Sequence, residues 1–199
     1  MIRTTEMLLA ELNDYAYPAN KLNRLVKQGT CTKIVRGLYE TDARAPGYLL
    51  AGSIYGPSYL SFDFALARYG LIPEAVCAFT CATFEKKKKK TYETPFGRYL
   101  YQDVPAQVFP MEIMVQTEQN YFYLIATPEK ALCDKLYTLS PVQNQKQLEA
   151  LLFDDLRIDP DEYAKLDRKT LTELCGYYHA ANLKLFSHYI GRTAHEHDL

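Results

Sequence analysis

The sequence predicts an α+β fold in which a small N-terminal helix-and-hairpin module precedes a larger mixed α/β domain that ends in helices. A chain of 199 residues corresponds to one large domain or two small ones. Helix-like and strand-like patterns alternate in its first two thirds, whereas the pattern after Pro141 is helical throughout. We therefore expect a module over residues 1–42 and a second domain over residues 43–199.

The expected module contains two helices and a hairpin. Residues 4–13 carry apolar side chains at helical spacing and end in a turn-prone Asn-Asp pair. Pro18 suits the first position of a second helix, which Gly29 is expected to end. Two β-prone runs, residues 31–35 and 38–40, flank an Arg-Gly turn and predict a tight hairpin.

The second domain is expected to mix helices and strands. Ser61 can cap a helix that Gly70 ends, and Thr127-Pro128-Glu129 begins another with a capping hydroxyl, a proline and an acid. Strand-like runs occupy residues 76–84, 98–102, 107–109, 112–116 and 121–126. The remaining helices are expected at residues 145–153, after Asp159-Pro160, and at residues 170–190.

The charges are balanced overall but not along the chain. A net charge of −1, from 23 basic and 24 acidic residues, excludes a uniformly basic nucleic-acid coat and a polyacidic tail. Between Tyr15 and Tyr39 there is no acid, but there are five bases: Lys21, Arg24, Lys27, Lys33 and Arg36. The first three recur at three-residue steps, so they share a broad helix face opposite the apolar one. A basic helix followed by a basic hairpin is typical of a winged helix-turn-helix on DNA. The alternative is an ordinary solvated helix face.

A second basic segment consists of Lys86, Lys87, Lys88, Lys89 and Lys90, between two predicted strands. Five adjacent like charges repel one another and favour an exposed, mobile loop. The other interpretation is a patch that contacts nucleic acid or an acidic partner, where each phosphate contact steepens the salt dependence of binding. Both interpretations stay open from the sequence.

The chain carries no signature of a disulfide framework, a metal site or a membrane span. Five cysteines without CxxC spacing suit free thiols in a reducing cytoplasm. Cys77 and Cys81 would lie about 13 Å apart on a strand, too far for two ligands of one zinc ion. The longest uncharged stretch, residues 45–62, is interrupted by prolines and glycines. We expect a cytoplasmic protein that needs no metal or cofactor.

Catalytic motifs are also missing from the sequence. It contains no GxSxG, GxxxxGK[ST] or GxGxxG pattern. Gly52-Ser53 is not followed by the Asp-x-Asp pair with which a nucleotidyltransferase holds its metal ions. We therefore expect a protein that is not an enzyme.

Four segments of the chain span residues 21–41, 56–74, 96–109 and 125–137, and three of them contain the short motifs RGLY at residues 36–39, SYLS at residues 58–61 and TPEKAL at residues 127–132. By these segments and their order, the chain resembles the AbiEi-type antitoxin family, the regulator half of bacterial type IV toxin-antitoxin systems. With the helical tail, the likeness covers most of the chain.

The resemblance implies a DNA-binding transcriptional autorepressor and antitoxin. Such a protein recognises inverted repeats in the promoter of its own operon, which suits a homodimer, and counters a nucleotidyltransferase-like toxin. By this resemblance, Lys21, Asn23, Arg24 and Lys27 would lie on the recognition helix, and Lys33 and Arg36 on the wing. The TPEKAL segment would be a structural strand-to-helix junction.

The module departs from the full winged pattern, because only one clear helix precedes the expected recognition helix. An alternative follows from this reduction. The chain would then be an antitoxin or adaptor that acts by protein interaction, through its Tyr-rich C-terminal domain and without specific DNA binding.

Overall fold

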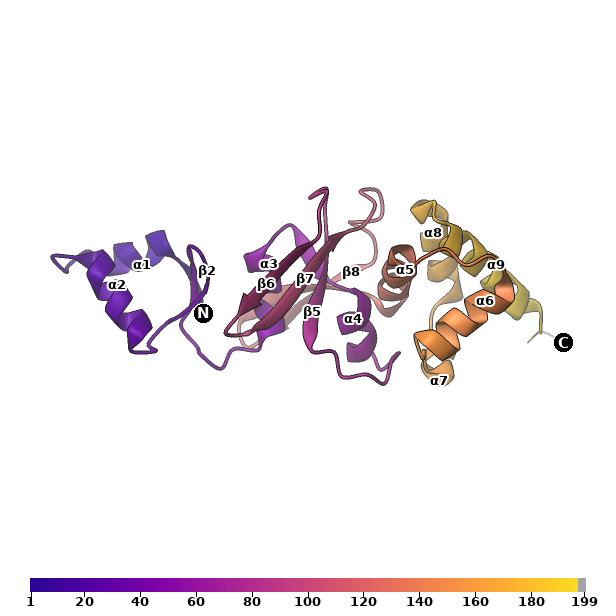
Figure 1. The fold of residues 1–199 in the computed structure, drawn as a ribbon, viewed down its shortest axis with the longest axis horizontal. Helices are drawn as coiled ribbons and strands as arrows, with labels where there is room; N and C mark the ends of the chain where they lie inside the picture. The colour runs from indigo at the N-terminus through magenta and orange to yellow at the C-terminus, as the bar shows by residue number, and fades with distance from the viewer. Residues whose placement is uncertain (197–199) are drawn as a thin grey trace.

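The computed structural model describes residues 1–196 and has the α+β architecture that the sequence predicts. Figure 1 shows three groups of elements along the long axis of the molecule. Residues 1–42, which we call the N-terminal module, lie at one end, a mixed β-sheet lies in the middle, and the last helices lie at the other end.

The N-terminal module folds as strand, helix, helix and hairpin. Its elements are β1 (Ile2–Thr4), α1 (Thr5–Glu11), α2 (Pro18–Lys27), β2 (Thr32–Val35) and β3 (Leu38–Glu40). The three strands form an antiparallel sheet in the order β1-β3-β2. The two helices and the hairpin confirm the sequence prediction, whereas β1 was not predicted, because three residues are too short to show a strand period.

Local chemistry explains where these elements begin and end. Thr4 caps α1, since its hydroxyl accepts a hydrogen bond from the Met7 amide at 3.2 Å. Pro18 occupies the first turn of α2, and Gly29 follows that helix with a left-handed φ of 73°. Gly37, at the hairpin turn, has a φ of 85°, which favours glycine.

The central sheet has six strands and mixed topology. They are β4 (Ser58–Leu60), β5 (Ala78–Thr83), β6 (Lys90–Thr94), β7 (Gly97–Asp103), β8 (Ile113–Glu118) and β9 (Tyr121–Ala126). Their order is β6-β7-β5-β4-β9-β8, so β6 and β8 are the edge strands. Strand β5 runs parallel to β7 and β4 runs parallel to β9, while the other pairs are antiparallel.

Helices lie on both sides of this sheet. The helices α4 (Phe62–Arg68) and α5 (Pro128–Thr138) pack on β5 and β9 and against each other. The short η1 (Gly47–Leu50) and α3 (Ala51–Ile54) contact β4 and β9. In Figure 1, α4 and α5 lie on the side that faces the C-terminal helices, and α3 lies toward the N-terminal module.

The C-terminal helices are α6 (Gln145–Ala150), the π-helical turn η2 (Leu151–Asp155), α7 (Pro160–Ala164), α8 (Arg168–Tyr178) and α9 (Ala181–Glu196). Of these, α8 and α9 pack on α5, and α6 packs on α9. The prediction of one helix over residues 170–190 is wrong, because His179 takes a left-handed φ of 51° between α8 and α9. A tertiary contact accounts for the break. The Asn182 amide donates hydrogen bonds to the carbonyls of Leu136, Leu139 and Ser140, and so ties the start of α9 to the end of α5.

Two further predictions of local structure need correction. Residues 107–109 form a turn instead of a strand, with the Val108 and Phe109 amides both donating to the Pro105 carbonyl at 3.1 Å. The apolar character of this run reflects burial, since Val108 is fully buried. Strand β4 lies inside the uncharged stretch of residues 45–62, where no strand is predicted, yet it is central, pairing with β5 and β9.

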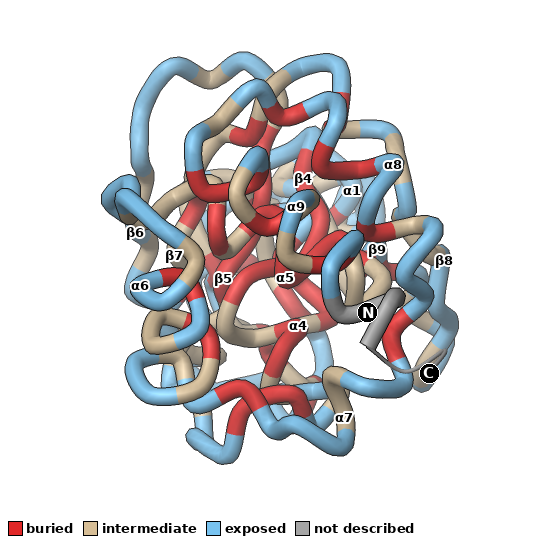
Figure 2. Tube along the Cα trace, turned by 90° about the vertical axis from the view of Figure 1, so that its right-hand side faces the viewer, coloured by how far each residue is buried: buried red, intermediate tan, exposed pale blue. Residues whose placement is uncertain are grey.

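The main core lies between the sheet and its flanking helices. Figure 2 shows buried segments gathered around α5, β5 and β4, with exposed segments of α6, α7 and β6 at the periphery. A second, small core in the N-terminal module consists of Leu8, Leu22 and Cys31. Ile34 in β2 belongs to the main core, so the small sheet is in contact with the rest of the protein.

Candidate nucleic-acid interface

The face of α2 opposite the small core carries the basic residues expected to bind DNA. Leu22 is buried, and the neighbouring turns pack Leu25 and Val26 on the same side. Asn23, Arg24 and Lys27 are exposed. Thus the amphipathic pattern predicted from the sequence is confirmed for α2.

Lys21 differs from the other basic residues of α2. It is half-buried, and its ammonium lies 4.8 Å from the centre of the Tyr15 ring. This distance is within the range of a cation–π contact. Lys21 is therefore held at the start of the helix by an aromatic side chain from the preceding loop.

The hairpin presents two further bases. Lys33 in β2 and Arg36 at the turn are both exposed, while Ile34 between them is buried. The pairing of β2 with β3 shifts register between Lys33 and Val35. A register shift of this kind changes the direction of the side chains at the end of two paired strands.

Within the described residues, no ion pair neutralises Lys21, Arg24, Lys27, Lys33 or Arg36. Two acids of the module are engaged elsewhere, since Glu11 pairs with Arg3 at 3.3 Å and Glu40 contacts the Met1 amino group. Cations that no described acid neutralises attract polyanions.

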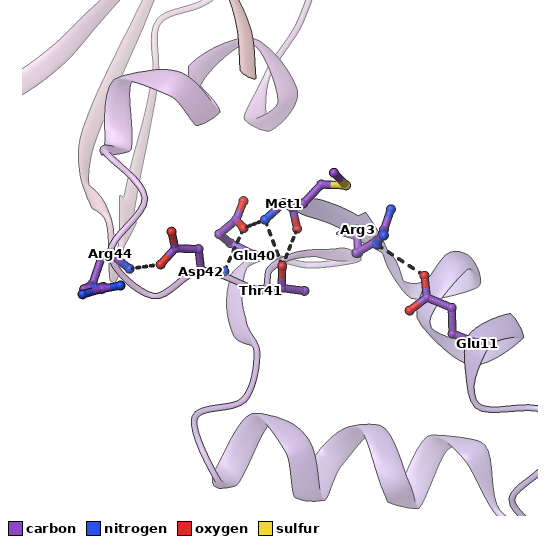
Figure 3. A network of polar contacts seen from close by, with 7 residues as sticks. All are labelled: Met1, Arg3, Glu11, Glu40, Thr41, Asp42 and Arg44. Atoms are coloured by element: carbon purple, nitrogen blue, oxygen red, sulfur yellow. Dashed lines mark hydrogen bonds and ion pairs between the residues drawn. The ribbon is translucent and has the colours of Figure 1, made fainter. Parts of the chain in front are cut away.

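Glu40, at the end of β3, is fully buried at the junction with the larger domain. Figure 3 shows its carboxylate in contact with the Met1 amino group, while the Asp42 amide donates to it at 2.9 Å. Burial and this same carboxylate raise the pKa of Tyr121 at the start of β9. The acid at the end of the hairpin therefore faces the junction and lies away from the basic turn.

The lysine run of residues 86–90 lies elsewhere, between β5 and β6. Lys87, Lys88 and Lys89 are exposed, but Lys86 and Lys90 are half-buried. The Lys87 amide donates to the Asp103 carboxylate, and Lys90 is the first residue of β6. The expectation of a fully solvated loop is therefore wrong for the two ends of the run.

A buried polar cluster was missed from the sequence. Lys130 and Asp134 in α5 form an ion pair at 2.8 Å, and both side chains are fully buried. The carboxylate also accepts hydrogen bonds from the hydroxyls of Tyr59 at 3.0 Å, Ser61 at 2.7 Å and Tyr178 at 2.5 Å. The signal that could have revealed it is a Lys and an Asp four residues apart within the otherwise apolar face of the TPEKAL helix.

This polar cluster links four parts of the chain. Thr127 caps α5 as predicted, with its hydroxyl accepting from the Lys130 amide. Ser61, by contrast, makes no side-chain cap for α4, because its hydroxyl donates to Asp134. Burial, followed by the charge of Asp134, raises the pKa of Tyr59 and Tyr178. The cluster thus joins β4, the start of α4, α5 and α8 through charge-assisted hydrogen bonds.

The five cysteines are free, as expected, and Cys77 alone among them is exposed. Burial raises the pKa of Cys81 and Cys133, which keeps these thiols protonated and unreactive. Among the described residues, no group of three His, Cys, Asp or Glu side chains is arranged to hold a metal ion. No helix in the same part of the chain combines the length and apolar character needed to cross a membrane.

Comparison with known proteins adds no further assignment. No protein-family model matches the chain, and no curated protein matches it. The fold and the site together define an α+β protein with a basic helix-and-hairpin module at one end.

Proposed function

We propose that the protein is a cytoplasmic, non-enzymatic antitoxin and DNA-binding autorepressor of a type IV toxin-antitoxin system, countering a nucleotidyltransferase-like toxin. One observation carries the DNA-binding part. The exposed bases of α2 and of the β2–β3 hairpin form no ion pair with any described residue, and two acids of the same module, Glu11 and Glu40, contact other groups. The likeness of the chain to the AbiEi-type family supports the antitoxin part.

In this proposal, α2 enters the major groove and the hairpin lies on the phosphate backbone. Asn23 and Arg24, both exposed, are suited to contact base edges, since Asn pairs with adenine and Arg with guanine. Lys27, Lys33 and Arg36 contact phosphates. A two-fold homodimer would match an inverted repeat, with each module on one half-site.

The test is a titration of the protein against fluorescent duplex DNA from the promoter of its own operon, at several salt concentrations. Arg24→Ala combined with Lys27→Ala should weaken binding about tenfold or more. Because Lys27 is the phosphate contact of this pair and Arg24 the base contact, the double variant should also lower the slope of log K against log salt by about 0.9.

A matched control keeps this result specific. Lys146→Ala combined with Lys184→Ala removes two exposed lysines from the C-terminal helices and should leave the affinity unchanged. A shuffled duplex should bind more weakly than the promoter. The proposal is wrong if the wild-type protein ignores promoter DNA at low salt, or if both double variants lose affinity equally.

A second candidate function is an antitoxin that acts by direct protein contact, and exposed apolar residues on β8 and β9 favour it. Val115 and Phe122 are 66% and 76% exposed, and Leu124, the cross-strand partner of Val115, is 40% exposed. These residues also line a cavity of about 300 Å³. A contiguous exposed apolar face of this kind is typical of interaction sites.

The tyrosines of the larger domain are not all available to this second candidate. Five of them, Tyr59, Tyr99, Tyr101, Tyr123 and Tyr178, are buried in the core. The hydroxyls of Tyr99 and Tyr101 donate to the carbonyls of Gly47 and Ala51, so these rings are structural.

The test of the second candidate is co-purification with the toxin encoded beside the gene. Val115→Ser with Phe122→Ser should abolish a direct complex, and absence of any wild-type complex would remove this candidate.

A further inference from the structure

The lysine run is interleaved with tyrosines on one face of the sheet edge, and this arrangement is not used by the proposed function. The Lys86 ammonium lies 5.1 Å from the centre of the Tyr55 ring, and the Lys90 ammonium lies 5.9 Å from the Tyr92 ring. The two rings are themselves 5.9 Å apart. We call these four residues the lysine–tyrosine platform.

Strand register places two members of the platform, Lys90 and Tyr92, on the same face of the sheet. Lys90 pairs with Tyr101 and Tyr92 pairs with Tyr99 across β6 and β7, so the side chains of these two residue pairs point to one side. Tyr55, which follows α3, packs its ring against both Tyr92 and Tyr101. The platform is therefore built from two segments that are distant in the sequence, residue 55 and residues 86–92, and both of its rings pack on the buried Tyr101 ring.

The five positive charges at this edge are only partly compensated, by the Asp103 carboxylate that accepts from the Lys87 amide. No lysine of residues 86–90 forms an ion pair with another described residue, while the nearby Glu93 is already paired with Arg98 at 3.0 Å. Lys87, Lys88 and Lys89 extend the positive charge beyond the platform into solvent. Strand β6 is the last strand of the sheet, so no further strand covers this edge.

We propose that the lysine–tyrosine platform and the adjacent exposed lysines bind single-stranded nucleic acid, with bases stacked on Tyr55 and Tyr92 and phosphates held by the lysines. Aromatic rings accept unpaired bases of any sequence, and a row of cations follows the backbone. In the free protein, Lys86 and Lys90 occupy the ring faces. An arriving base takes the place of each ammonium over the ring, and the long lysine side chains swing to the phosphates.

This site differs from α2 in the nucleic acid that it selects. A duplex keeps its bases stacked inside, so it can offer phosphates to the lysines but no ring to the tyrosines. Stacking therefore favours a single strand over a duplex at the platform. An acidic protein segment would satisfy the lysines equally well but would gain nothing from Tyr55 and Tyr92.

The experiment measures the binding of fluorescent 12-nucleotide oligo-dT and oligo-U by full-length protein at several salt concentrations. Lys88→Ala with Lys89→Ala removes two exposed charges without touching the platform, and it should weaken binding roughly tenfold and lower the salt slope by about 1.4. Lys146→Ala with Lys184→Ala is the matched control and should leave both values unchanged.

Stacking is tested by a different signature. Tyr92→Leu should weaken binding roughly tenfold with no change in the salt slope, whereas Tyr92→Phe, which keeps the ring, should bind like wild type. Thermal unfolding of both variants separates lost stacking from lost folding. Arg24→Ala with Lys27→Ala should leave oligo-dT binding intact, so failure of the promoter-binding proposal and failure of this one are distinguishable.

Three outcomes would overturn the inference. The first is no binding of either oligonucleotide at low salt by wild-type protein. The second is equal affinity for a 12-base-pair duplex and the single strand, with no effect of Tyr92→Leu. The third is displacement of the oligonucleotide by an oligo-glutamate peptide that binds as tightly and whose affinity does not change in Tyr92→Leu. This result would identify an acidic protein partner instead.

Discussion

The buried Lys130–Asp134 pair allows a quantitative prediction, because its two charges are supported unequally. When Lys130 is replaced by Met, the Asp134 carboxylate keeps the hydroxyls of Tyr59, Ser61 and Tyr178 as donors. When Asp134 is replaced by Leu, the Lys130 ammonium keeps one hydroxyl acceptor, Tyr178 at 2.6 Å, together with the Tyr59 and Tyr178 rings. The second substitution should therefore be the more harmful.

The expected magnitudes follow from the burial. Removing one partner of a buried ion pair costs about 3–5 kcal/mol, since it leaves an uncompensated charge away from water. We expect about 3 kcal/mol for Lys130→Met and about 5 kcal/mol for Asp134→Leu. The double variant leaves no buried charge, so its cost should fall well below the sum of about 8 kcal/mol.

Urea unfolding followed by circular dichroism measures all four proteins of this cycle. In thermal unfolding, Lys130→Met should lower Tm by about 6–12 °C, at roughly 2–4 °C per kcal/mol for a chain of this size. The reasoning fails if either single variant lies within about 0.5 kcal/mol of wild type. It also fails if the double variant costs as much as the two single variants together.

Three smaller predictions concern caps and close packing. Thr127→Ala should lower the free energy of unfolding by about 1 kcal/mol, and Thr127→Ser should restore it, as urea titration would show. Gly47→Ala should cost about 3 kcal/mol in the same assay, because its Cβ would lie 2.2 Å from the Phe96 carbonyl oxygen; a wild-type midpoint would contradict this. The hydrogen bond from the Thr170 hydroxyl lowers the pKa of the Asp167 carboxyl in the folded protein below its ordinary value of 3.8. The stability that this carboxylate gives to α8 is therefore present at neutral pH. It is lost as the pH falls below 3.8 and through the lower pKa of the folded state. Asp167→Asn keeps a capping oxygen that does not titrate, so unfolding curves across this range should show a flatter acid limb for the variant.

Much of the candidate interface could be predicted from the sequence, because it depends on local periodicity. The spacing of Lys21, Arg24 and Lys27 around Leu22 determines which face of α2 is exposed, whatever the helix packs against. The lysine–tyrosine platform could not be predicted in the same way. Its Tyr55 and Tyr92 meet through the packing of α3 on the sheet, and no local pattern records that contact.

Elements whose signals are local follow from the sequence alone. Helix α2 begins at Pro18 and is followed by Gly29 at its C-terminal end. Thr127 caps the start of α5, and Asp159 caps the start of α7 by accepting from the Asp161 and Glu162 amides. Caps, prolines and left-handed glycines act on neighbouring backbone groups, so their effect is complete within a few residues. This is why they could be identified before any tertiary contact was known.

Which short segments become strands, and which polar groups are buried, depends on tertiary contacts. Ser58–Leu60 is a strand because β5 and β9 supply its partners, and His179 divides two helices because Asn182 is tied to the end of α5. Lys130 is fully buried because Asp134 and Tyr178, the latter 48 residues away, complete its hydrogen bonds. A strand or a buried charge is stable only when residues from distant parts of the chain complete its hydrogen bonds. Local sequence patterns do not show which distant residues will meet.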